Sequence, residues 1–140
     1  MTKRKRVLIL CTGNSARSQM AEGLLRYEGG DRFEVASAGV APTRLRPEAI
    51  VVMKEIGIDI SRHNSKLVAE FTNQKFDYVI TVCDNANEQC PVFPGETKRI
   101  HWSFDDPATA KGGDEERLSV FRRVRDEIRH RLRLFAVATR

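Results

Sequence analysis

The chain lacks long hydrophobic runs. No apolar stretch approaches the ~18 residues that a membrane-spanning helix needs, and the basic residues 1–6 are followed only by the short run Val7–Leu10. This pattern is unlike a signal peptide. Internal repeats, low-complexity segments and linkers are also missing. We therefore expect a single domain over residues 1–140, located in the cytoplasm and without membrane contact.

Cysteine is scarce. The sequence has three, Cys11, Cys83 and Cys90, which are too few for a disulfide scaffold and odd in number. In a reducing compartment this usage favours catalysis, redox chemistry or metal binding over structural bridges.

Positive charge exceeds negative charge only modestly, with a formal net charge of +5. The basic residues gather in the N-terminal flank and in "RRVRDEIRHRLRLF" near the C-terminus, without interleaved aromatic residues and with acidic residues mixed into the second stretch. We expect no nucleic-acid binding, because mixed charge on a helix face is usually a solvated surface. The positive balance favours a small anionic ligand.

Apolar runs alternate with helical periodicity along the chain. We expect strands at Val7–Leu10, Phe33–Ser37, Asp77–Val82 and Lys98–Trp102. We expect four helices. The first carries Met20 to Leu25 and stops at Gly29-Gly30, and the second runs from Pro47 to Gly57 with Ile50, Met53 and Ile56 inward. The third spans Ser65–Phe71, and the fourth runs from Asp114 to the C-terminus. This order predicts an α/β fold with a parallel sheet. Functional sites in such folds lie beyond the carboxyl ends of the strands, where Cys11 and Cys83 stand.

The stretch "LILCTGNSARSQMAEG" places a cysteine in a loop between a strand and a helix. Such a loop points several backbone N–H groups into one concavity, and the helix dipole adds positive potential. A cysteine there has its thiolate stabilised. Gly13 permits a tight turn, and Asn14 tolerates a left-handed conformation. Arg17 offers a planar fork for two oxygens of an oxyanion, and we expect Ser18 to donate its hydroxyl to the Cys11 sulfur.

The Cys-x5-Arg spacing is weak evidence by itself, and a buried structural cysteine at a strand end is the alternative. Asp105 and Asp106, before Pro107, supply a carboxyl able to protonate a leaving oxygen. Taken alone, they fit two solvated loop aspartates better.

Six residues separate Cys83 from Cys90, and three interpretations stay open at this point. A zinc site has His101 as a third ligand but no apparent fourth. Two unrelated thiols are also compatible with the spacing. In the third interpretation the two thiols form a redox pair that resolves a bond on Cys11 by successive thiol–disulfide exchange.

The run "CTGNSARSQMAEG" resembles the phosphate-binding loop of the low-molecular-weight protein tyrosine phosphatase superfamily, and most closely its thioredoxin-coupled arsenate reductase branch. Further matches are "SAG" at 37–39, "DIS" at 59–61, "ITVC" at 80–83, "CP" at 90–91 and "HWSFDDPA" at 101–108. The likeness spans nearly the whole chain.

The resemblance implies a four-stranded parallel sheet flanked by helices in a three-layer sandwich. It implies that Cys11 is the nucleophile and that Asp106, directly before the proline, is the general acid, with Asp105 as a possible stand-in. The residues implied to bind the oxyanion are Thr12, Gly13, Asn14, Ser15, Ala16 and Arg17.

For the reaction, the resemblance implies that Cys11 attacks arsenate, that Cys83 then attacks Cys11 and expels arsenite, and that Cys90 attacks Cys83. The resulting Cys83–Cys90 disulfide is reduced by thioredoxin, so no cofactor and no metal are implied. We expect a monomer, and we expect residues 84–94 to rearrange between redox states.

The alternative is a low-molecular-weight tyrosine phosphatase, which needs Cys11, Arg17 and Asp106 but neither Cys83 nor Cys90. Tyrosine phosphatases of the superfamily carry aromatic residues after the Asp-Pro pair to grip a phenol ring, and "DPATAKGG" has none. A non-catalytic oxyanion-binding module is a third possibility, in which neither the acid nor the cysteine pair has a use.

Two positions depart from the family pattern. Ala16 stands where many reductase relatives have a further cysteine outside the relay. Lys66 follows Ser65 where relatives that bind a monovalent cation have an aspartate. We expect its ammonium group to take the place of the cation, near Asn14, Glu22 and Ser37.

Overall fold

A computed structural model describes residues 4–140, so the start of the basic N-terminal flank (residues 1–3) lies outside the described part. The strands are β1 (Lys5–Cys11), β2 (Phe33–Gly39), β3 (Tyr78–Thr81) and β4 (Lys98–His101). The α-helices are α1 (Arg17–Gly29), α2 (Pro47–Lys54), α3 (Asp84–Glu88) and α4 (Asp114–Ala138), and three 3-10 helices are η1 (Gly30–Arg32), η2 (Val68–Phe71) and η3 (Pro107–Thr109).

The four strands form one parallel sheet in the order β2-β1-β3-β4. This confirms the expected four-stranded parallel sheet. The central strand β1 is an unbroken apolar run, and Val7 to Leu10 are fully buried because both faces of the strand are covered. In the register of the sheet, Cys11 lies opposite Gly39, and Leu10 lies opposite Thr81. The chain segments after β1 and β3 therefore leave the sheet at the same edge.

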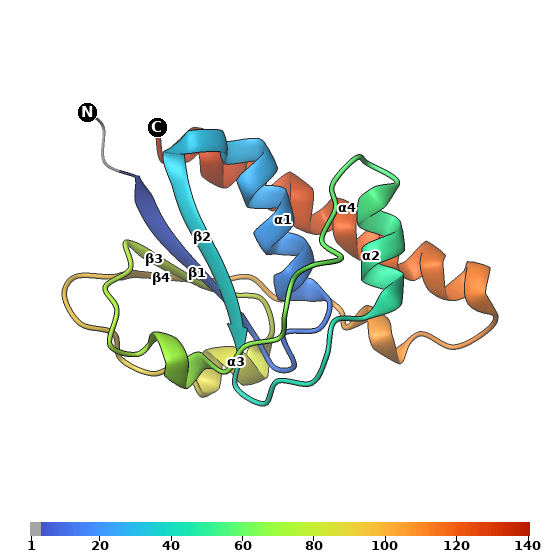
Figure 1. The fold of residues 1–140 in the computed structure, drawn as a ribbon, viewed down its shortest axis with the longest axis horizontal. Helices are drawn as coiled ribbons and strands as arrows, with labels where there is room; N and C mark the ends of the chain where they lie inside the picture. The colour runs from blue at the N-terminus through green and yellow to red at the C-terminus, as the bar shows by residue number, and fades with distance from the viewer. Residues whose placement is uncertain (1–3) are drawn as a thin grey trace.

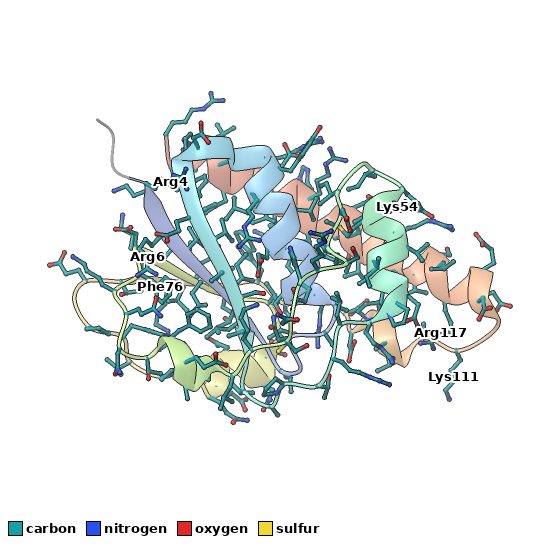
Figure 2. All side chains as sticks on the ribbon, in the orientation of Figure 1. Arg4, Arg6, Lys54, Phe76, Lys111 and Arg117 are labelled. Atoms are coloured by element: carbon teal, nitrogen blue, oxygen red, sulfur yellow. The ribbon has the colours of Figure 1, made fainter. Side chains whose placement is uncertain are left out.

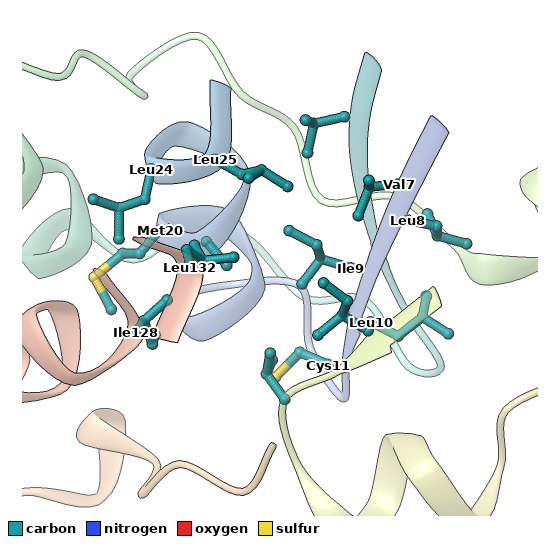
Figure 3. Close-up of a cluster of buried hydrophobic side chains, with 14 of the residues drawn as sticks. Val7, Leu8, Ile9, Leu10, Cys11, Met20, Leu24, Leu25, Ile128 and Leu132 are labelled. Atoms are coloured by element: carbon teal, nitrogen blue, oxygen red, sulfur yellow. The ribbon is translucent and has the colours of Figure 1, made fainter. Parts of the chain in front are cut away.

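The long helices α1 and α4 pack against each other over one face of the sheet, and α2 packs against α4 (Figure 1). Along β1, Ile9 points toward these helices while Leu8 points to the opposite side (Figure 3). Met20 and Leu24 of α1 and Ile128 and Leu132 of α4 complete this core, and all four side chains are fully buried. In the described part of the chain, no helix is both long and apolar enough to cross a membrane.

Two helical predictions need correction. In α2 the buried side chains are Ala49, Val52 and Met53, whereas Ile50 and Ile56 are only partly buried, because the helix ends at Lys54 and leaves Ile56 in the following turn. The helix expected over 65–71 shortens to η2, because the chain before it is extended. Leu67 forms a parallel bridge with Gly39, and the Gly39 N–H donates to the Lys66 carbonyl.

Candidate active site

The loop from Thr12 to Ala16 connects β1 to α1 at the carboxyl edge of the sheet. Its conformation depends on Asn14, which has a φ of 47°, a region that costs most L-residues energy. The buried Asn14 side chain offsets this cost: Nδ2 donates to Ser18 Oγ (2.8 Å) and Ser37 Oγ (2.9 Å), and Oδ1 accepts from Lys66 N (2.9 Å). Beneath the loop, a Cβ on Gly39 would stand 2.5 Å from the Thr12 carbonyl oxygen. The loop therefore has one well-defined shape.

The carbonyl groups of the loop face away from the cavity above it. The N–H groups of Ala41, Thr43 and Arg46 donate to the carbonyls of Thr12 (2.9 Å), Gly13 (3.0 Å) and Ser15 (2.9 Å). Within residues 4–140, no hydrogen bond is recorded from the backbone N–H groups of residues 13–16. A peptide N–H points opposite to the carbonyl of the same peptide unit, so these donors are available to an anion in the cavity.

The cavity has a volume of about 790 Å³. Its lining comprises Cys11, Thr12, Gly13, Ser15, Ala16, Arg17, Ala41, Thr43, Arg44, Leu45, Arg46, Pro47, Asp106 and Ala108. Arg17 is held by a hydrogen bond from Nη1 to the Phe104 carbonyl (3.0 Å), and its Nη2 lies 3.7 Å from Asp106 Oδ2. Asp106 Oδ1 accepts from Ala108 N (3.0 Å), which fixes the carboxylate at the start of η3.

Asp105 is placed differently from its neighbour. It is exposed, it pairs with Arg123 of α4 at 3.2 Å, and it does not line the cavity. Of the two aspartates before Pro107, the geometry therefore favours Asp106 as the acid.

Cys11 and Cys83 are buried thiols in contact at the ends of adjacent strands. Cys83 Sγ lies 3.2 Å from Thr12 Oγ1 and accepts from Ala86 N at 3.4 Å. Because Asn85 Nδ2 donates to Thr12 Oγ1 (3.1 Å), the Thr12 hydroxyl hydrogen is free to point at the sulfur.

These contacts set the charge of the thiol pair. The hydrogen bond from Cys11, aided by those from Thr12 and Ala86, lowers the pKa of Cys83 to about 5 despite its burial. The same hydrogen bond, together with burial, raises the pKa of Cys11, although the Arg17 guanidinium opposes this. This is the opposite of the stabilised Cys11 thiolate that the loop alone led us to expect, because Cys11 donates its hydrogen to Cys83. The hydrogen bond between the two thiols therefore favours a single negative charge shared by the pair, with Cys83 as the more acidic partner.

Cys90 lies apart, beyond α3. Its thiol donates to the Pro91 carbonyl at 3.6 Å, and burial raises its pKa. The neighbouring Val92 is 90% exposed, so an apolar side chain stands in solvent beside this cysteine. No disulfide joins the three cysteines.

Two other predicted contacts are tested by the geometry. Ser18 Oγ accepts from Asn14 Nδ2, and the described part of the chain records no hydrogen bond from it to Cys11, so Ser18 supports the loop and not the sulfur. Lys66 Nζ lies 3.8 Å from the buried carboxylate of Glu22, which also accepts from Ser37 Oγ at 2.6 Å. Lys66 Nζ also donates to the Asn64 carbonyl (2.9 Å), so the ammonium group lies near Glu22 as expected, and its taking the place of a cation stays a prediction.

Sequence reasoning missed the role of His101, which it considered only as a zinc ligand. Its Nδ1 pairs with Thr81 Oγ1 (2.8 Å) and its Nε2 with Asp84 Oδ1 (2.9 Å), so the ring ties β4 to the start of α3. Among the described residues, no three His, Cys, Asp or Glu side chains are grouped to hold a metal ion. The zinc interpretation of Cys83, Cys90 and His101 therefore finds no support in the geometry.

A parallel α/β sheet, a cysteine in a loop of free N–H groups and an adjacent Asp–Arg pair define a cysteine-dependent enzyme class that acts on oxyanions. Residues 6–139 match the model of one such family. The chain belongs to the low molecular weight phosphotyrosine protein phosphatase family.

Within this family the chain is similar to proteins named arsenate reductase. It is 50% identical to an arsenate reductase of Halalkalibacterium halodurans over 133 residues, which cover 95% of this chain and 96% of that one. It is 32% identical, with a TM-score of 0.82, to a solved arsenate reductase in the oxidized state, over 96% and 98% of the two chains. A thioredoxin-dependent arsenate reductase from Corynebacterium glutamicum is 28% identical with a TM-score of 0.71, over 96% of this chain and 61% of that one.

Proposed function

We propose that this protein reduces arsenate to arsenite and that thioredoxin reduces the disulfide which results. The observation that carries the proposal is the second buried thiol, Cys83, in hydrogen-bond contact with Cys11. Hydrolysis of a phosphate ester has no use for a second thiolate beside the nucleophile. Transfer of two electrons to arsenic needs one, because a disulfide must form. The arsenate reductase relatives described above support the same choice.

In the first step, the N–H groups of the loop and the Arg17 guanidinium hold three oxygens of arsenate. The Cys11 proton passes to Cys83 as the Cys11 sulfur attacks arsenic. One As–O bond breaks, and Asp106 donates the proton with which that oxygen leaves as water. Arsenic stays pentavalent in this adduct.

In the second step, Cys83 gives its proton to an oxygen on arsenic and attacks the Cys11 sulfur as a thiolate. A Cys11–Cys83 bond forms and the S–As bond breaks. The electron pair of that bond stays on arsenic, which is thereby reduced to the trivalent state and leaves as arsenite. Cys90 then attacks Cys83, and Cys11 departs as a thiolate. The thiols of reduced thioredoxin reduce the Cys83–Cys90 disulfide and return the enzyme to its starting state.

The transfer to Cys90 requires the segment 84–94 to move, because Cys83 lies in the interior against Cys11 while Cys90 lies beyond α3. Opening α3 is inexpensive: the helix has five residues, of which only Ala86 is buried. Isolated helices of this length are unstable in water.

A phosphatase is the second candidate, and the Arg17–Asp106 pair above the nucleophile favours it. The cavity lining, as far as the structure describes it, includes no aromatic side chain that would grip a phenol ring. Weak hydrolysis of aryl phosphates is therefore compatible with the site, as a side activity.

The proposal is tested by NADPH consumption in the presence of thioredoxin and thioredoxin reductase. Arsenate-dependent turnover is expected for the wild type and is lost in Cys83→Ser and in Cys90→Ser. Lys111→Gln, on an exposed loop, serves as the control and keeps full activity. Absence of arsenate-dependent turnover, together with aryl phosphate hydrolysis that survives both cysteine substitutions, would contradict the proposal in favour of the phosphatase.

A further inference from the structure

The cavity above the loop is much larger than a tetrahedral oxyanion. Its 790 Å³ lie within the range of about 300–1,000 Å³ typical of pockets for drug-sized ligands. The loop and Arg17 form one end of it. The segment 41–47, which is hydrogen-bonded to the loop, also lines the cavity and contributes Arg44 and Arg46. The cavity thus has room and positive charge beyond what one arsenate ion requires.

The two additional arginines differ from Arg17 in their partners. Arg17 lies 3.7 Å from Asp106, whereas the described residues record no ion pair for Arg44 or Arg46. Arg46 makes one long contact, 3.4 Å from Nη2 to the Ala108 carbonyl.

Glu48 lies close enough to Arg46 for the two charges to attract each other, but the described residues record no ion pair between them. Glu48, at the start of α2, accepts from Arg117 of α4 at 2.9 Å, so its carboxylate is already engaged. Figure 2 labels Arg117 near the start of α4 and Lys111 on the loop that precedes this helix. The segment 41–47 itself carries two arginines and no acidic residue.

This segment is also held in position. The N–H groups of Ala41, Thr43 and Arg46 bind the carbonyls of the loop, as described above. Pro47 then begins α2 with its φ fixed by the ring. The backbone that carries the arginines is thus joined to the oxyanion loop at three points, and the distance between the two charged regions is set by the fold. The backbone under the two arginines is therefore fixed, and only their side chains have to order when a ligand binds.

We propose that Arg44 and Arg46 form a second anion subsite, and that the cavity takes phosphoryl or arsenyl oxyanions that carry a second acidic group. The oxyanion binds the loop and Arg17, and the second group, a carboxylate or another phosphoryl, binds the two arginines. Planar guanidinium groups suit either acid. The subsite rests on the proposed function, because it assumes that the loop of residues 12–17 holds the oxyanion.

Matched pairs of non-hydrolysable ligands test the subsite by isothermal titration calorimetry on the reduced full chain. Phosphonoacetate is compared with ethylphosphonate, and 3-phosphonopropionate with propylphosphonate; each pair differs by its carboxylate. We expect at least one phosphonocarboxylate to bind about tenfold more tightly than its alkyl partner, the gain typical of a charge-assisted hydrogen bond. In Arg44→Gln/Arg46→Gln this ratio falls to within about twofold of one. Lys111→Gln keeps the wild-type ratio.

Two measurements keep the outcome interpretable. The double variant is expected to bind the alkylphosphonates within about threefold of the wild type, since only the screened field of two charges is lost, and this binding also reports an intact fold. Arg44→Gln alone, at an exposed residue, gives an affinity ratio between those of the wild type and the double variant. Equal affinities within both pairs in the wild type would overturn the subsite, as would an unchanged ratio in the double variant. If inorganic phosphate itself does not bind, the oxyanion loop of the proposed function fails and the subsite fails with it.

Discussion

Replacing Thr12 with valine raises the pKa of Cys83. Valine keeps the shape of threonine but removes the hydroxyl that lies 3.2 Å from the Cys83 sulfur. A hydrogen bond to a charged group contributes about 1.5–3 kcal/mol, and one pKa unit corresponds to about 1.4 kcal/mol. The loss therefore shifts the pKa of Cys83 from about 5 to roughly 6–7. The Ala86 N–H and the Cys11 thiol remain as donors, so the pKa stays below that of a free thiol.

The assay is the pH dependence of alkylation by iodoacetamide in a Cys90→Ser background, read for each cysteine by peptide mass spectrometry. A lowered pKa means that the Cys83 thiolate persists as the pH falls and is lost only when the pH passes about 5. In Thr12→Val the same loss occurs at a pH higher by about one to two units. At pH 5.5 the variant is therefore alkylated at Cys83 several-fold more slowly, while at pH 9 the two proteins differ little.

Asn85→Ala is the matched control for Thr12→Val. It removes the donor to Thr12 Oγ1 but leaves the hydroxyl beside the sulfur, so the shift is expected to stay below about half a unit. An unchanged alkylation profile in Thr12→Val would refute the assignment of this hydroxyl as a donor to Cys83. A large shift in Asn85→Ala would show that the position of α3 controls the thiolate instead.

Four further predictions concern the support of the site. Gly39→Ala forces the loop to move, because the new Cβ would stand 2.5 Å from a loop carbonyl oxygen. A displacement near 1 Å lowers turnover about 10²-fold. Arsenate turnover near the wild-type rate would contradict this contact. Potassium has no effect on the wild-type rate, because the Lys66 ammonium already faces the Glu22 carboxylate; strong stimulation over sodium would contradict this. His101→Phe removes the hydrogen bond to Asp84 at the start of α3, so the backbone amides of α3 should exchange hydrogen about fivefold faster. Unaltered exchange would exclude this role of His101. Leu132→Ala, at a fully buried position, should lower the free energy of unfolding in urea by about 2–5 kcal/mol, and a loss below 1 kcal/mol would mean that the α4 core repacks.

The sheet and the loop were predictable from the sequence because their signals are local. The unbroken apolar run before Cys11 is best explained by a strand that is covered on both faces. Because the strands are parallel, the carboxyl ends of β1 and β3 meet at one edge of the sheet. The contact between Cys11 and Cys83 follows from that topology. The relay itself was implied by the family resemblance and not by spacing.

The missed features depend on contacts between distant residues. α3 escaped prediction because "DNANE" has no apolar periodicity and buries only Ala86. The Thr12 hydroxyl acquires its role from Asn85, which lies far along the chain. Nothing in the sequence distinguishes Arg44 and Arg46 from solvated surface charges. Only the fold shows that both line the same cavity as the loop.

A single turnover without any reductant tests the central claim most directly. Reduced protein is mixed with excess arsenate, and the released arsenite and the disulfides are quantified by mass spectrometry. The account predicts one arsenite per wild-type molecule with a Cys83–Cys90 disulfide, one arsenite with a Cys11–Cys83 disulfide in Cys90→Ser, and none in Cys83→Ser. Arsenite release by Cys83→Ser, or a wild-type protein that releases none, would contradict the relay.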